Sequence, residues 1–175
     1  MIGKRSRVTA FGMTVLGAMA LAVALAGSSP AAAASVDDVK KLRDTCQCAG
    51  CDLKVADLQG ANLKGGDLTK ANLRDAGLKG ANLSDTTLNA ARLDRADLTR
   101  ANLREANLKK ARLGRAIMRG VQFKEASFEG ALLNKADLSG ANLSDAENLT
   151  QAQLNEACGD ADTVLPGSMT IPACK

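Results

Sequence analysis

Large apolar residues recur at every fifth position along most of this chain. The series begins at Leu53 and reaches Leu143 without a break. Two positions before each of these residues the side chain is small in nearly every case, as at Ala56, Ala61 and Ala71. The remaining three positions of each five are mostly polar or glycine, so two residues in five are suited to a core.

A period of five fits neither regular secondary structure. An α-helix repeats every 3.6 residues and would spread these leucines around all its sides, whereas a strand repeats every two and would alternate them between faces. A chain that turns regularly can keep one large and one small residue of each five facing inward. Such units must stack to bury a continuous core, which predicts a solenoid.

Individual units identify a resemblance. Residues 61–65, 71–75 and 101–105 read Ala-Asn-Leu followed by two variable residues. They resemble the pentapeptide-repeat family over about residues 51–145. The resemblance implies an all-β solenoid, a right-handed quadrilateral β-helix in which four pentapeptides complete one coil.

Both ends of the repeat carry helix signals. Ser35 and Asp38 have the spacing of a capping box and predict a helix over about 36–44. After Leu143 the leucine register slips, and Thr150 with Gln153 predicts a second helix over 151–157, with Gly159 just past its end. We expect the segments to be a signal peptide (1–34), an N-terminal cap (35–50), the repeat (51–145), and a C-terminal cap with a disulfide-closed tail (146–175).

The segment 1–34 has the layout of a secretory signal peptide. A basic start precedes an apolar run over 8–26, and Ala32–Ala34 offers small residues for cleavage after Ala34. The alternative is a membrane anchor that stays attached. Cleavage predicts a periplasmic or secreted bacterial protein without a transmembrane segment.

Composition narrows the function. The chain has no His, no Trp and no Tyr, which removes His-dependent catalytic sites and most zinc sites. Without residues 1–34 it carries 20 basic and 19 acidic side chains, a balance unlike that of a general nucleic-acid binder. We expect no enzyme, no cofactor, no metal site and no nucleic-acid partner.

Five cysteines in an exported chain indicate disulfides. Cys158 and Cys174 would close a loop of about 15 residues. At the front, resemblance to exported family members favours Cys48 with Cys51 and leaves Cys46 free; Cys46 with Cys51 is the alternative. A redox-active pair and a three-cysteine metal site are the functional alternatives to a structural staple.

One face of the predicted coil collects basic residues. With four units in a coil, residues 20 apart stack, so Arg92 lies under Arg112 and Arg95 under Arg115. No acid follows Asp94 on this face. Stacked like charges repel, and an anionic partner would relieve that repulsion.

Three functions are therefore weighed. The first is a structural or protein-interaction scaffold in the cell envelope, with a protein as its partner. The second is binding of an anionic envelope polymer through Arg92, Arg95, Arg112 and Arg115. The third, protection of topoisomerase by DNA mimicry, is known in the family but needs an acidic surface and a cytoplasmic location.

Overall fold

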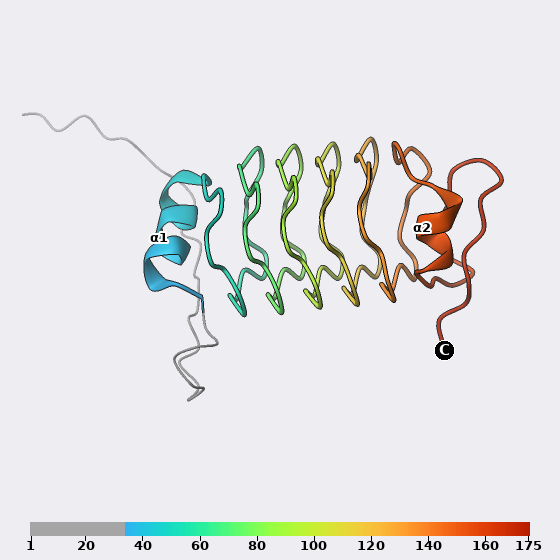
Figure 1. Ribbon diagram of the computed structural model, residues 1–175, viewed down its shortest axis with the longest axis horizontal. Coiled ribbons are helices and arrows are strands. Elements are labelled where there is room, and N and C mark those ends of the chain that lie inside the picture. Colours follow the sequence, from blue (N-terminus) through green and yellow to red (C-terminus); the bar gives the residue numbers. More distant parts are fainter. Residues whose placement is uncertain (1–33) are drawn as a thin grey trace, which may run out of the picture.

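The computed structural model describes residues 34–175, which form one elongated coil with a short helix near each end (Figure 1). Helix α1 spans Val36–Thr45 and helix α2 spans Gln151–Asn155. Between them the backbone winds through successive coils, and its pairing consists of single parallel bridges rather than long strands. The predicted signal peptide lies outside the described residues, except for its last residue, Ala34.

Each pentapeptide makes one side and one corner of the coil. In the unit centred on Leu58, the N–H of Ala61 donates to the carbonyl of Leu58 at 3.0 Å and closes a tight turn. Gly60, the third residue of that turn, has a φ of 66°, the left-handed region that a type II turn requires there. The turn sends the chain around the next corner, which is why neither a helix nor a strand forms.

Successive coils pair along their backbones. Bridges join residues 20 apart, as in Asp52 with Asn72, so four pentapeptides complete one coil. The N–H of Leu53 donates to the carbonyl of Asn72 at 2.9 Å, and the N–H of Asn72 donates to the carbonyl of Cys51 at 2.9 Å. The first bridge joins Gln47 to Asp67, so the coil begins before residue 51, where the sequence placed its start.

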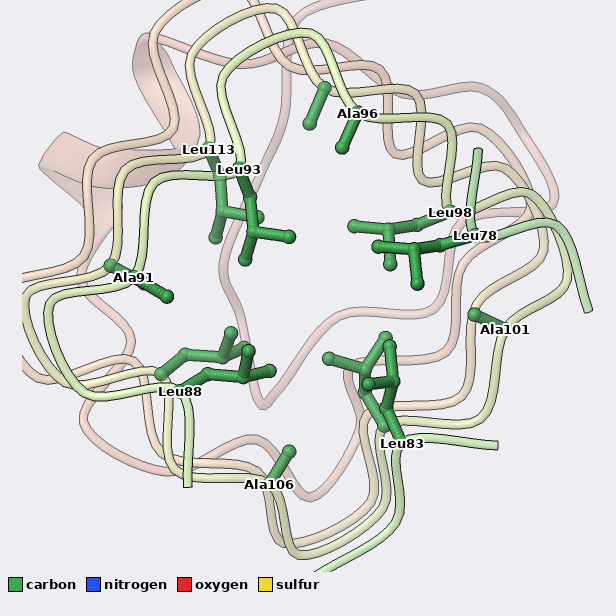
Figure 2. Packing of buried hydrophobic residues seen from close by; sticks show 14 of the residues in the cluster. Leu78, Leu83, Leu88, Ala91, Leu93, Ala96, Leu98, Ala101, Ala106 and Leu113 are labelled. Carbon is green, nitrogen blue, oxygen red and sulfur yellow. The ribbon is translucent and has the colours of Figure 1, made fainter. Parts of the chain in front are cut away.

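The core is a column of leucines with alanines between them. Figure 2 shows Leu78, Leu83, Leu88 and Leu93 pointing inward from the four sides of one coil, and all four are fully buried. Leu98 begins the next coil and stacks on Leu78. Later in the stack, Phe123 and Phe128 meet edge to face with ring centroids 5.1 Å apart, a favourable aromatic geometry that fills the core.

Helix α1 is joined to the first coil through its own cap residues. The Ser35 hydroxyl accepts a hydrogen bond from the N–H of Asp38 at 3.3 Å, as the capping motif predicts. The Asp38 carboxylate does not complete the box, because it accepts from the N–H of Asp52 at 2.7 Å instead. Leu42 is buried against the core, so the helix contributes an apolar residue to the end of the stack.

Helix α2 is shorter than the sequence predicted. Its capping box between Thr150 and Gln153 is complete, but the helix ends at Asn155, with Glu156 as its C-cap in a right-handed conformation. Gly159 is therefore not the residue that ends the helix. A Cβ at Gly159 would lie 2.7 Å from Thr163 Oγ1 and 3.0 Å from Ile171 Cγ2, so glycine is needed because the returning tail packs against it.

The register slips where α2 is inserted. Asp137 pairs with Cys158 and Asn142 with Val164, so each partner lies beyond the position that the regular repeat would pair. The coil thus continues beyond the repeat with extra residues looped out. Over residues 34–175, neither helix has the length and hydropathy of a membrane span.

Candidate anion-binding face

We use the name arginine face for the outward side of the units centred on Leu73, Leu93, Leu113 and Leu133. Each unit presents three outward positions: the residue before the leucine and the two residues after it. The bridge between Arg92 and Arg112 confirms that these two lie in consecutive coils. The face carries six basic residues: Arg74, Arg92, Arg95, Arg112, Arg115 and Lys135.

Arg95 is already paired within the protein. Its Nε and Nη2 donate to the two carboxylate oxygens of Asp75 at 2.6 and 2.7 Å. This two-pronged contact lowers the pKa of Asp75 below its ordinary value and raises the pKa of Arg95 above its own. The guanidinium of Arg95 therefore has an intramolecular anion and is poorly placed to hold a second one.

Arg112 has a weaker partner. Its Nε lies 3.4 Å from Asp94 Oδ2, which is an ion pair. The contact does not have hydrogen-bond geometry, and Asp94 Oδ2 is buried without a hydrogen-bond partner. Arg112 is held near an acid that it does not fully satisfy.

Arg92 and Arg115 differ from these two. Within residues 34–175 neither guanidinium forms an ion pair. The Nε atoms of Arg92 and of the neighbouring Arg74 are buried and make no hydrogen bond within the described chain. Of the four arginines that the sequence brought together, Arg95 and Arg112 have an acid of the protein beside them, and Arg92 and Arg115 have no ion-pair partner among residues 34–175.

A surface hollow of about 430 Å³ lies over this arrangement. Its basic lining is the whole set of six named above, and Asp94, Gly114, Leu132 and Asn134 complete it. Gly114 lines the hollow without a side chain, and a Cβ there would lie 3.1 Å from Asp94 Oδ1, so the Asp94 carboxylate borders the same spot. The sequence predicted a row of charges and gave no indication of this concavity.

The expectation that no acid follows Asp94 on this face is wrong. The slipped register brings Glu156 over the last coil, where its carbonyl accepts from the N–H of Lys135 at 2.6 Å. Its carboxylate also accepts from Asn134 Nδ2 at 3.3 Å. Glu156 follows α2 and lies outside the five-residue pattern, so counting in twenties could not place it here.

A second hollow, of about 620 Å³, lies over the adjoining face, which we call the second face and define by Leu58, Leu78, Leu98, Met118 and Leu138. Its cations are mostly neutralised: Lys79 pairs with Asp97 at 3.2 Å and Arg119 with Asp137 at 2.6 Å. Glycines form most of its corners, at residues 60, 80, 120 and 140. This hollow is larger but offers an anion less unpaired positive charge.

The structure also contains two disulfides. Cys48 is bonded to Cys51, and Cys158 to Cys174, while Cys46 is free and partly buried. Cys174 Sγ lies 3.4 Å from Asp137 Oδ1, so the tail contacts the second face. Asp137, Cys158 and Cys174 have possible ligand atoms within 4.8 Å of one another, but both sulfurs are engaged in the disulfide and are not thiolate ligands.

Comparisons with solved structures return pentapeptide repeat proteins. Rfr23 from the cyanobacterium Cyanothece 51142 is 28% identical, with 74% of this chain and 97% of that chain covered and a TM-score of 0.44. A pentapeptide repeat protein from the Arabidopsis thaliana thylakoid lumen is 27% identical, with 54% and 66% covered and a TM-score of 0.37. QnrB1, a plasmid-mediated fluoroquinolone resistance protein, is 14% identical, with 74% and 83% covered and a TM-score of 0.36.

A search of curated proteins found no match. The family described as Pentapeptide repeats (8 copies) matches residues 46–85, 81–120 and 122–158, which together are more than half of the chain. These ranges contain the bridges from Gln47 to Cys158 that build the coil. The chain therefore belongs to the pentapeptide repeat family.

Proposed function

We propose that this protein is a non-catalytic interaction scaffold of the bacterial cell envelope, and that it binds a protein partner through one outer face. The observation that carries the proposal is the filled interior. The inward leucines and alanines of every coil are buried against one another, so a partner can only meet the outward positions. Those outward positions repeat at a fixed spacing on a stiff frame, which suits recognition of an extended surface.

Export and segment boundaries are part of this proposal. We propose that residues 1–34 are a cleaved leader, that α1 and α2 cap the two ends of the stack, and that the mature protein works in the periplasm or outside the cell. The two disulfides support an oxidising compartment. N-terminal sequencing of protein from its native cells should begin at Ser35, and an intact Met1 in the cytoplasmic fraction would contradict export.

Face-specific cross-linking tests the scaffold. A photo-reactive amino acid is placed at one exposed outward position on each of the four faces: Lys135, Lys79, Arg104 or Lys110. In intact native cells, we expect one face to give a discrete cross-linked product that competes with excess unlabelled protein. Equal, non-competable products from all four positions would contradict a dedicated binding face.

Binding of an anionic envelope polymer is the second candidate. The observation that favours it is the hollow on the arginine face, which six cationic side chains line and one acid enters. Positive charge concentrated in a concave site attracts anions, and this attraction is stronger at low salt because fewer ions screen it. DNA mimicry is not favoured, because it would need an acidic surface, whereas this face is basic and the chain without residues 1–34 carries 20 basic and 19 acidic side chains.

Salt-dependent binding tests this candidate. Binding of heparin and of lipopolysaccharide is measured as salt is raised, for wild type and for a variant with Arg92, Arg95, Arg112 and Arg115 all changed to Gln. We expect wild type to bind at low salt and to release as salt rises, and the quadruple variant to lose most of this binding. Unchanged binding by the variant at every salt concentration would reject the arginine face as an anion site.

A further inference from the structure

We propose that the arginine face holds one tetrahedral oxyanion, a phosphate or sulfate ester of a polymer, in the hollow over Gly114, and that Arg92 and Arg115 are its principal ligands. This inference rests on the second candidate function and makes it specific. The four arginines are then not equivalent: two bind the external anion, and two pair with acids of the protein itself.

Pairing within the protein separates the two classes. Arg95 donates twice to Asp75, and Arg112 lies against Asp94, so an external anion would have to compete with an acid already in contact. Arg92 and Arg115 have no such acid among residues 34–175. An anion bound by these two therefore gains their attraction without breaking an existing ion pair.

A third arginine lines the same hollow. Arg74 has no ion-pair partner among residues 34–175, and its side chain, like that of Arg92, lines the hollow. The Nε atoms of both are closed to solvent, so a bound anion would meet the outer ends of these two guanidinium groups. Lys135 adds a further positive charge from the last coil.

The floor of the hollow explains its position. The residues stacked with Gly114 in the same outward column are Arg74, Asp94 and Asn134, so only this coil lacks a side chain there. The missing side chain opens a recess between the coil of Arg92 and that of Lys135. A ligand group seated there would be approached by cations from both sides, and it would lie beside the Asp94 carboxylate, whose charge Arg112 offsets.

The choice of a tetrahedral anion follows from the number of donors. A planar carboxylate is satisfied by one guanidinium fork, as Asp75 is by Arg95 on this very face. Phosphate and sulfate esters present more acceptor oxygens, directed away from one plane. Donors converging from Arg74, Arg92, Arg115 and Lys135 suit that arrangement better than a carboxylate.

Charge-matched double variants test the assignment, with heparin as the probe. Arg92→Gln/Arg115→Gln and Arg95→Gln/Arg112→Gln each remove two positive charges from the same two outward columns. We expect the first pair to weaken binding about tenfold or more and the second by less than about threefold. Equal losses in the two variants would show that a diffuse field attracts heparin and would overturn the assigned site.

Filling the recess is an independent test that leaves net charge unchanged. Gly114→Asn places in the recess the residue that stands above it at Asn134, whereas Gly77→Asn makes the same change on the second face, where a Cβ has only an ordinary contact with Asp57. We expect Gly114→Asn to lose binding and Gly77→Asn to keep it, with similar melting curves. Full heparin binding by a folded Gly114→Asn variant would overturn the seat over Gly114.

Three polymers identify the anion. We expect heparin and polyphosphate, which carry tetrahedral oxyanions, to bind more tightly than polygalacturonate, which carries only carboxylates. Equal affinity for polygalacturonate would overturn the choice of anion. If both double variants lose heparin binding equally and the quadruple variant also loses it, only this inference is refuted. If the quadruple variant binds heparin as wild type does, the anion-binding candidate function itself is refuted.

Discussion

The repeat coils and the C-terminal segment (residues 146–175) continue the same stack by different means. In the coils, the backbone satisfies itself: the N–H of a leucine donates to a carbonyl of the next coil, as Leu98 does to Ile117 at 2.8 Å. That acceptor comes just before Met118, the counterpart of Leu98. In the C-terminal segment the spacing is irregular, and Leu143 reaches the carbonyl of Val164, later in the chain than a regular coil would supply it. The same ladder is thus reached with extra residues looped out.

Side chains take over where the repeat ends. Gln153 Nε2 donates to the carbonyls of Phe128 and Ala131 at 2.8 and 2.9 Å, and Thr163 Oγ1 donates to the carbonyl of Leu138 at 3.1 Å. Asp160 accepts from the N–H of Gly140 at 2.8 Å. In the coils, the five-residue period is enough to pair the backbone of one coil with that of the next. At the C-terminal end, particular side chains and a disulfide are needed as well.

The largest effect is expected in the middle of the coils. Leu98 is fully buried with coils on both sides, so Leu98→Ala should lower the free energy of unfolding by about 2–5 kcal/mol, because little can move to fill the cavity. Leu154 in α2 is equally buried but lies at an end, where the chain can relax, so Leu154→Ala should cost less. Urea denaturation measures both.

Lys79→Ala is the control for the coil. Lys79 is exposed and its pair with Asp97 is solvated, so the variant should lose under about 0.5 kcal/mol. Equal losses for Leu98→Ala and Lys79→Ala would show that the assigned register is wrong.

The tail disulfide should matter next. It joins residues 16 apart, and removing it with Cys158→Ser/Cys174→Ser should cost about 3 kcal/mol in the chain-entropy account. The loss should loosen the C-terminal segment first, seen as faster hydrogen exchange there than in the coils. Cys48→Ser/Cys51→Ser, which opens a link between residues only three apart, should cost less.

Peptide mapping without reductant gives the corresponding chemical test. Protein purified from an oxidising compartment should yield a cross-linked peptide containing Cys158 and Cys174. Recovery of both cysteines as free thiols would contradict the disulfide. It would also contradict the statement that a covalent bond holds the C-terminal segment.

Low pH should reduce the stability that the Asp137 carboxylate contributes where the coils meet the C-terminal segment. Burial acts to raise the pKa of Asp137, but hydrogen bonds from Ser139 and Arg119 outweigh it and hold this pKa below its ordinary value. A depressed pKa contributes stability above about pH 4, the value for the unfolded chain, and the contribution is lost as pH falls through the folded value. Stability should therefore fall below about pH 4, and less steeply in Asp137→Asn.

Asp97 provides the matched carboxylate within the coils. Burial again opposes ionisation, and Thr99 and Lys79 lower its pKa as Ser139 and Arg119 do for Asp137. Asp97→Asn should flatten the acid limb in the same direction. If neither variant changes the pH dependence of unfolding, these two carboxylates are not the cause of the loss of stability at low pH.

The smallest effect is a gain. Val55 is 51% exposed and has a φ of 62°, an unfavourable region for a β-branched residue that asparagine tolerates better. Val55→Asn should raise the free energy of unfolding by about 0.5–1 kcal/mol. Val164 in the C-terminal segment is 48% exposed and is not among the residues with positive φ, so Val164→Asn should bring no such gain.

Much of the fold could be predicted from the sequence because it is local. A period of five with an inward leucine and a small residue two positions earlier needs no knowledge of distant contacts, and the buried residues follow it from Leu53 to Leu143. The Thr150 and Gln153 capping box was predictable for the same reason, since its two residues are three apart. The length of α2 was not, because the backbone rejoins the ladder at Glu156, whose carbonyl accepts from the distant N–H of Lys135.

The candidate site depended on both levels. The four-unit coil was enough to bring Arg92, Arg95, Arg112 and Arg115 to one face. It could also have placed Asp75 under Arg95, because they occupy the same position of consecutive coils. The ion pair between Asp75 and Arg95 was therefore predictable from the sequence, although only the row of basic charges was predicted.

The sequence by itself therefore determined which residues face inward and which face is basic, because both follow from counting in fives and twenties. Only the tertiary structure decided which arginines have an acid beside them, since Arg112 reaches Asp94 diagonally across coils. It also decided that a hollow lies over Gly114 and that the Glu156 carboxylate reaches Asn134 at the end of the face. These features depend on side-chain reach and on an irregular chain end, neither of which a repeat period encodes.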